Sequence, residues 1–540
     1  MLTVLILTLS LLVGAYSALS VQVGNTNVIG RDIGEIEFFG GIPFAEPPLG
    51  ELRLNFPVLN STFNTKTFNA QNFGPSCLQT PAPPTGVSED CLTLNVFRPS
   101  GIASEANLPV LVWIYGGILM HMLHFAVGGS SFYNATELVK RSVSRGTPIL
   151  FVSINYRLGP LGFPQGIEAG QLKILNLGYH DQLTALQWIQ ENIGHFGGDK
   201  TKVIISGESA GAASIATFFL ESRIKAFARG AIMESAALVN IFGPERNEAN
   251  WQQYVAAVPE CASFAGTNDT FACLRAASTV SLEQAIVATR INFQNISFAP
   301  AIDGPGGIVP ARPSQIKPQG SLPTLFGTNL DEGTLFTPQA IDSAVEIKDM
   351  LSALVSPPIV SPEKLAATIA RVLELYPDAP ALGSPFGTGN ATFGLSSEYK
   401  RQAAFYGDFV YQSSRRTLSH QISAQGIPVF AYLFTDHDAV TTICNAVPHT
   451  SEIPYVFGRL MNVTPRASAL STIMQDYWIS FVDTLDPNDH RGSERPEWAR
   501  YTPNNQVVLE LNGQRTALVP DNYRAQQVAF LQDNSDALHR

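Results

Sequence analysis

The residues best placed for covalent chemistry centre on Ser209 in the sequence GESAG, residues 207–211. The short β-branched run at residues 202–206 predicts a buried parallel strand, and the apolar residues 212–220 predict a helix. Glycines on both sides of a serine between strand and helix predict a sharp turn that exposes the hydroxyl. A chance match in an ordinary turn is the alternative, but the strand and the helix favour Ser209 as a nucleophile.

A serine hydroxyl needs a histidine to take its proton and a carboxylate to orient that histidine. In hydrolases built on such a turn, the acid and the histidine follow the serine in that chain order. On residue type alone His449 is one of nine histidines, and a satisfied polar role is the commoner one. His437, flanked by two aspartates, is a competitor, although a solvated loop explains it better.

These side chains need a framework, and the chain is long enough to build a large one. It has 540 residues, of which 45% are hydrophobic, and no linker, low-complexity tract or internal repeat divides it. We therefore expect one α/β domain over residues 21–540. The apolar residues 1–20 end in small residues and predict a cleaved secretory signal, with a membrane anchor as the alternative.

The net charge and the cysteines limit the binding partners and the cellular compartment that we expect for this protein. The formal net charge is −11 and no basic run opposes it, so no nucleic-acid partner is expected. The spacing of the five cysteines favours two short disulfides, Cys77 with Cys91 and Cys261 with Cys273, leaving Cys444 as a buried free thiol. No clustered Cys/His set is present, so neither a metal nor a cofactor is expected.

Secretion is also indicated by six Asn-x-Ser/Thr sequons, which are acceptors for N-glycosylation. They lie at Asn60, Asn134, Asn268, Asn295, Asn390 and Asn462.

Several segments resemble the type-B carboxylesterase/lipase family, which includes fungal lipases, bile-salt-activated lipase and cholinesterases. They are GESAG preceded by KVIIS, FGGIPFAEPPLGELRL at residues 39–54, EDCLTLNV at 89–96 and ALQWIQENIGHFGGD at 185–199. The resemblance implies the α/β-hydrolase fold, with a large, mostly parallel central sheet flanked by helices.

The same resemblance assigns the catalytic partners of the serine. In the segment GTNLDEGTLF it implies that Glu332 is the catalytic acid, with Asp331 as the fallback and a surface turn as the structural alternative. In NAVPHTSEIPYVFG it implies that His449 is the base. It also implies that Glu208 is a carboxylate in the substrate pocket.

Two buried ion pairs follow from the resemblance as well, Arg53 with Glu89 and Arg157 with Asp181. Such pairs fix the packing around the catalytic turn.

The oxyanion hole is where the chain departs from the family. Backbone N–H groups of Gly117, Ile118 and Ala210 are the expected donors. The family has one small residue after the two glycines of this loop, whereas this chain has seven, ILMHMLH, at residues 118–124. Three interpretations are open: a real apolar flap, a gene-model error such as a retained intron fragment, and an inactive protein.

The loop between Cys77 and Cys91 bears on the substrate. It is too short and too rich in proline for an amphipathic lid helix, and it holds no aromatic residue for a choline group. We therefore expect a secreted serine carboxylic-ester hydrolase that acts on lipophilic esters through an acyl-enzyme. The alternative is a catalytically impaired, esterase-like binding or adhesion protein. The sequence makes no prediction of oligomeric state.

Overall fold

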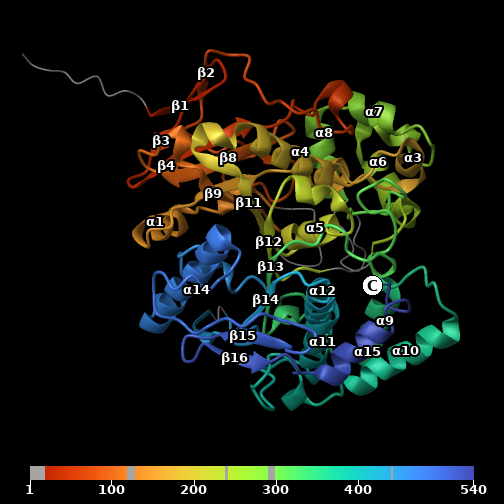
Figure 1. The fold of residues 1–540 in the computed structure, drawn as a ribbon. Coiled ribbons are helices and arrows are strands. Elements are labelled where there is room, and N and C mark those ends of the chain that lie inside the picture. The colour runs from red at the N-terminus through yellow and green to blue at the C-terminus, as the bar shows by residue number, and fades with distance from the viewer. Residues whose placement is uncertain (1–18, 118–127, 238–240, 290–297, 440–441, 540) are drawn as a thin grey trace, which may run out of the picture.

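The structure is a computed structural model that describes residues 19–117, 128–237, 241–289, 298–439 and 442–539. Its centre is an eleven-stranded sheet in the order β16-β15-β14-β13-β12-β11-β9-β10-β8-β4-β3 (Figure 1). The strands of this sheet are β3 (Arg31–Asp32), β4 (Ile36–Pro43), β8 (Thr93–Pro99), β9 (Leu108–Ile114), β10 (Leu150–Ile154), β11 (Gly198–Glu208), β12 (Gly230–Glu234), β13 (Thr324–Asn329), β14 (Val429–Phe434), β15 (Val507–Leu511) and β16 (Ala517–Pro520).

The strands from β10 to β15 in this order are parallel to one another, while β8, β4, β3 and β16 add antiparallel edges. Apart from Leu108 and residues 199–202, the residues of strands β9 to β14 are buried, as expected of parallel strands covered on both faces. The predicted fold class, a large and mostly parallel sheet flanked by helices, is confirmed.

Helices cover both faces of the sheet. In Figure 1, α1 (Thr136–Ser144) and α14 (Pro465–Thr484) lie on one side, and α4 (Leu177–Asn192), α5 (Ala210–Phe218) and α12 (Ser413–Ser423) lie on the other. The remaining helices are α2 (Gly159–Gly162), α3 (Gly166–Leu172), α6 (Glu248–Ala257), α7 (Phe271–Ala276), α8 (Thr279–Ala288), α9 (Ala344–Leu354), α10 (Pro362–Leu375), α11 (Ser397–Gly407), α13 (Ile453–Val456) and α15 (Ala525–Asp533).

Short strands at the N-terminal end complete the fold. Strands β1 (Ser20–Val23), β2 (Thr26–Ile29) and β5 (Thr67–Asn69) form a separate small sheet. Strands β6 (Ser76–Cys77) and β7 (Val87–Ser88) pair beside the first disulfide. Both predicted disulfides, Cys77–Cys91 and Cys261–Cys273, are present. The residues between Cys77 and Cys91 contain no helix, in agreement with the prediction from their prolines.

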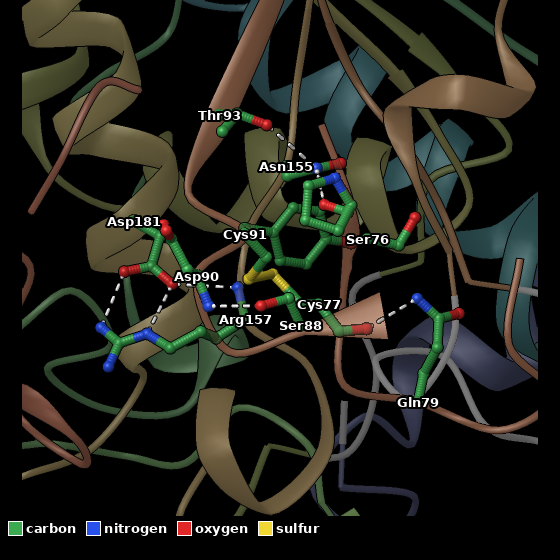
Figure 2. The surroundings of a disulfide bond; sticks show 12 residues. Ser76, Cys77, Gln79, Ser88, Asp90, Cys91, Thr93, Asn155, Arg157 and Asp181 are labelled. Carbon is green, nitrogen blue, oxygen red and sulfur yellow. Dashed lines mark hydrogen bonds and ion pairs between the residues drawn. A yellow bond between two sulfur atoms is a disulfide. The ribbon is translucent and has the colours of Figure 1, made fainter. Parts of the chain in front are cut away.

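The two predicted buried ion pairs are also confirmed. Arg53 Nε lies 2.6 Å from Glu89 Oε2, and Arg157 Nη2 lies 2.7 Å from Asp181 Oδ1. Figure 2 shows the second pair beside the Cys77–Cys91 disulfide. Each arginine uses two of its nitrogens on the two carboxylate oxygens, so both pairs have the forked geometry that makes such contacts directional.

Candidate active site

The predicted turn around Ser209 joins β11 directly to α5. Ser209 has φ 56° and ψ −119°, a conformation that costs free energy in a non-glycine residue. A Cβ atom on Gly207 would lie 2.6 Å from the carbonyl oxygen of Ile114, and one on Gly211 would meet the same carbonyl. Only glycine fits at either position, so the pattern of the sequence is explained by close contact with β9.

Hydrogen bonds hold the strained serine in place. Its N–H donates to the carbonyl of Glu234 at the end of β12 over 2.9 Å, and its carbonyl accepts from the N–H of Ala213 over 2.8 Å. The residue is 2% exposed. Ser209 therefore sits at the carboxyl end of the parallel sheet, where the loops that follow β9, β12, β13 and β14 converge.

Glu332 and His449 are in direct contact, as expected. Nδ1 of His449 lies 2.6 Å from Oε2 of Glu332, and both side chains are buried. The other oxygen of Glu332 accepts hydrogen bonds from the Asn329 N–H at 2.7 Å and from the Ser235 hydroxyl at 2.6 Å. These bonds fix the carboxylate, which in turn fixes the orientation of the imidazole.

Asp331 and His437, the alternative candidates for the acid and the base, lie in different surroundings from Glu332 and His449. Asp331 turns away from His449, and its Oδ1 accepts from the Ser384 hydroxyl at 2.7 Å and from the Phe386 N–H at 2.8 Å. Burial raises the pKa of Asp331 to about 6. His437 is exposed on a short turn.

The far nitrogen of His449 contacts a second carboxylate. Nε2 lies 3.0 Å from Oε1 of Glu208, the residue before Ser209. Burial by itself would lower the pKa of His449, but Glu208 and Glu332 together raise it to about 10. Burial raises the pKa of Glu208 from its ordinary value of 4.5, and contact with His449 opposes that rise.

No hydrogen bond joins Ser209 to His449 in the described part of the structure. Within the described part of the chain, Ser209 Oγ and His449 Nε2 both lack an aligned hydrogen-bond partner. Catalytic hydrogen bonds are often long or misaligned in ligand-free sites and shorten when substrate binds. In this state the carboxylate of Glu208 occupies the position next to Nε2.

Sequence reasoning missed two aromatic residues that enclose the imidazole. The ring centroid of Tyr411 lies 4.6 Å from that of His449, and the Phe336 centroid lies 5.1 Å from it. Phe336 follows Glu332 by one turn, so its position in the GTNLDEGTLF segment was an available signal. Tyr411 comes from a distant segment that carries no local signal.

Two more buried carboxyl groups lie close to the site. Asn329 Nδ2 donates to Glu452 Oε2 over 2.6 Å, and Trp478 Nε1 donates to Glu234 Oε1 over 2.8 Å. Burial and the charges of Glu208 and Glu332 raise the pKa of Glu452 to about 8. Burial and the charge of Glu452 raise the pKa of Glu234 well above its ordinary value.

Part of the expected oxyanion hole is described. Ala210 is the first residue of α5, so its N–H has no acceptor within the helix. Gly116 lies against Ser209, because a Cβ on Gly116 would come within 2.9 Å of the Ser209 Cβ. Gly117 follows it and is buried, whereas Ile118 and the rest of residues 118–124 lie outside the described residues.

The residues on either side of the segment that contains this insertion, Gly116 and Gly128, lie close together in space. A Cβ on Gly128 would lie 2.7 Å from the carbonyl oxygen of Gly116. Gln79, in the disulfide-closed loop and visible in Figure 2, accepts from the Gly128 N–H at 2.8 Å and donates to its carbonyl at 2.6 Å. Gln79 therefore holds the second end of the oxyanion loop against the rest of the protein.

Several peripheral predictions can be placed. Three of the sequon asparagines are exposed: Asn268, Asn390 and Asn462. Two are partly exposed, Asn60 and Asn134, and Asn295 lies outside the described residues. Cys444 is free as predicted, but it is partly exposed rather than buried, because it lies on a surface turn beside Gln339.

The described residues contain neither a metal-binding cluster nor a membrane-spanning helix. They contain no group of three or more His, Cys, Asp or Glu side chains that could hold a metal ion. None of the helices in the described part of the chain is long and apolar enough to cross a membrane.

Comparisons with known proteins agree with this geometry. The chain is 32% identical to lipase 2 of Geotrichum candidum, over 94% of this chain and 93% of that protein. It is 30% identical to a secreted triacylglycerol lipase of Gibberella zeae, over 96% of this chain and 91% of that protein.

Solved structures give the same result. Aspergillus niger EstA superposes with a TM-score of 0.83 at 26% identity, over 97% of this chain and 99% of that one. A PNB esterase superposes with a TM-score of 0.75 at 28% identity, over 95% of this chain and 100% of that one. The profile of the carboxylesterase family matches residues 17–531. The chain thus belongs to the carboxylesterase family and is a carboxylic-ester hydrolase.

Proposed function

We propose that this protein is a secreted serine esterase that cleaves lipophilic carboxylic esters through an acyl-enzyme, with Ser209, His449 and Glu332 as the catalytic triad. The observation that supports this most is the strained turn of Ser209 beside the 2.6 Å contact between His449 and Glu332. A strained serine next to an oriented imidazole is what nucleophilic ester cleavage requires.

The reaction follows from these groups. His449 Nε2 accepts the proton of Ser209 as Oγ attacks the ester carbonyl carbon, and the N–H of Ala210 stabilises the oxyanion, with Gly117 and Ile118 as the other proposed donors. Collapse expels the alcohol, which takes the proton from His449. Water then attacks the acyl-enzyme in the same way, giving its proton to His449 and releasing the acid as Oγ is reprotonated.

Glu332 serves this cycle by holding the imidazole and stabilising its charged form. Its position is fixed by Ser235 and by the backbone of Asn329. Glu208 contacts the nitrogen that must accept the serine proton, so His449 has to leave Glu208 for Ser209 when a substrate binds.

Secretion and substrate class rest on separate support. Two disulfides and five accessible sequons suit an extracellular protein, and three of the relatives are named as secreted lipases. The predicted signal at residues 1–20 lies mostly outside the described residues. The relative named as a triacylglycerol lipase supports lipophilic esters, including glycerides, as substrates. We propose that residues 21–540 act as one domain.

Covalent labelling tests this proposal directly. A p-nitrophenyl alkylphosphonate should add one phosphonyl group to the secreted protein, release p-nitrophenol and abolish ester hydrolysis, with peptide mapping placing the adduct on Ser209. The Ser209→Ala variant is the control and should remain unlabelled. A folded, unlabelled wild-type protein would instead favour an esterase-like binding protein.

A further inference from the structure

We propose that the hydroxyl of Tyr411 is a catalytic hydrogen-bond donor to Ser209 Oγ, which stabilises the negative charge that develops on that oxygen in both half-reactions. This inference rests on the proposed serine mechanism and adds a fourth side chain to it. It concerns a residue that no motif of the sequence indicates.

The first support is that the hydroxyls of Tyr411 and Ser209 are both buried and, within the described part of the chain, unpaired. An interaction with the Ser209 side chain also works against the rise of the Tyr411 pKa on burial. Among the residues that the structure describes, neither hydroxyl has an aligned hydrogen-bond partner. A fully buried hydroxyl without a partner costs free energy, and such groups are found where a ligand or a reaction satisfies them.

The second support is the contact between Tyr411 and the base. Its ring lies 4.6 Å from the His449 ring at an interplanar angle of 36°, and 5.8 Å from the ring of Phe336 at 26°. The ring of the tyrosine therefore packs against the imidazole that takes part in the proposed proton transfer.

The backbone that carries Tyr411 is fixed independently of the site. Residues Asp408–Gln412 form a single π-helical turn between α11 and α12, a feature that often marks functional positions. At one end, Asp408 pairs with Arg524 at 2.7 Å. At the other end, Gln412 donates to the Asn329 carbonyl over 3.1 Å. Anchors on both sides hold Tyr411 in place, so the position of its hydroxyl does not depend on bound substrate.

The chemistry of the group fits a donor and excludes a base. Burial raises the pKa of Tyr411 well above its ordinary value, and nearby Tyr406 and the two glutamates raise it further, so the hydroxyl stays protonated at every working pH. Ser209 Oγ has two lone pairs and one proton. When Tyr411 donates to one lone pair, the serine proton remains free for His449.

The donor acts at both points where charge appears on Oγ. In acylation, Oγ loses its proton to His449 as it attacks the carbonyl carbon. In deacylation, Oγ leaves the tetrahedral intermediate and regains a proton from His449. Tyr411 transfers no proton in either step, and its hydrogen bond strengthens as Oγ becomes an alkoxide.

Tyr411→Phe removes only the oxygen and keeps the ring against His449. We expect the rate constant for Ser209 phosphonylation to fall by about 10- to 100-fold, the range for losing a hydrogen bond to a charged group. The burst and steady-state phases with a p-nitrophenyl ester should show similar losses in acylation and deacylation. The acid limb of the pH profile should not move, because Glu208 and Glu332 set the pKa of His449.

The matched control is Tyr406→Phe. The Tyr406 ring also packs on Phe336, at 5.3 Å, and is buried, so Tyr406→Phe likewise removes one buried hydroxyl beside the site. This control should phosphonylate at the wild-type rate. A second test keeps the oxygen: 3-fluorotyrosine at position 411 is a stronger donor and should preserve or raise the rate.

Three results separate the possibilities. Phosphonylation of Tyr411→Phe within twofold of the wild-type rate would overturn this inference and leave the serine mechanism intact. A loss of the same size with 3-fluorotyrosine would also overturn it. A wild-type protein that is not labelled at Ser209 would instead overturn the proposed function.

Discussion

Nε2 of His449 lies 3.0 Å from Oε1 of Glu208, and the proposed mechanism uses this nitrogen to receive the serine proton. Because Glu332 holds Nδ1 on the other side, the imidazole is placed between two carboxylates. This arrangement stabilises the imidazolium, so the base is protonated when the site is empty. The effect of this protonation on the rate of hydrolysis at neutral pH can be measured.

The first prediction concerns pH. With the pKa of His449 at about 10, kcat/KM should still rise with pH above neutrality, since only the neutral imidazole can accept a proton. Glu208→Gln removes one of the two stabilising charges and should move the acid limb down by about one to three pH units. Initial rates with a soluble ester at each pH check this, with Glu51→Gln, an exposed position, as the control. An unmoved limb in Glu208→Gln would contradict the assigned electrostatics.

A second prediction addresses the triad. Ser209→Ala, Glu332→Gln and His449→Ala should each lower kcat by about 10⁴-fold or more, and combinations should add little, because the three side chains act as a unit. Far-ultraviolet circular dichroism would verify that the fold is kept. His437→Ala should hydrolyse esters normally. Near-normal turnover by His449→Ala together with an inactive His437→Ala would reverse the assignment of the base.

The local parts of this site could be predicted from the sequence, and the long-range parts could not. The turn at Ser209 is encoded by five consecutive residues whose glycines avoid the Ile114 carbonyl. The pairing of Glu208 with His449 depends on where β11 and the loop after β14 end, which no local pattern specifies. The position of Tyr411 depends on one π-helical turn, which has one residue more than an α-helical turn, and the surrounding sequence gives no sign of that turn. Closeness in sequence to His449 predicts a buried Cys444, yet Cys444 lies on a turn and is partly exposed.

A third prediction concerns stability. With its pKa at about 8, Glu452 keeps a proton in the folded protein that the unfolded chain releases above its ordinary pKa of 4.5. The stability from that proton is fully present below the unfolded pKa and is lost as pH rises through the folded pKa. Glu452→Gln should therefore raise Tm by about 1 to 3 °C near pH ~9 and change it little near pH ~5. A thermal shift that is equal at the two pH values would show that Glu452 titrates normally.

The fourth prediction tests the link between Gln79 and the oxyanion loop. Gln79→Ala removes both hydrogen bonds to Gly128 and frees the second end of the segment. We expect kcat to fall by about tenfold with a smaller change in KM, because loosened N–H donors affect the transition state more than the bound ester. Gln190→Ala, which loses two bonds to carbonyls far from the site, is the control for general destabilisation. Equal effects of the two substitutions would remove Gln79 from the positioning of this loop.

The last prediction concerns the insertion itself. Gly116 and Gly128 are adjacent in space, so the chain between them can be shortened without moving either end. If residues 118–124 are foreign to a working loop, their replacement by a single glycine should restore a donor opposite Ala210 and raise kcat by about 10²- to 10³-fold. The gain should appear in kcat more than in KM, because the donor meets the oxyanion only as charge develops. Kinetics with acetate and long-chain esters decide the outcome: a shortened protein that loses long-chain activity and keeps acetate activity would identify the insertion as a wall of the acyl site.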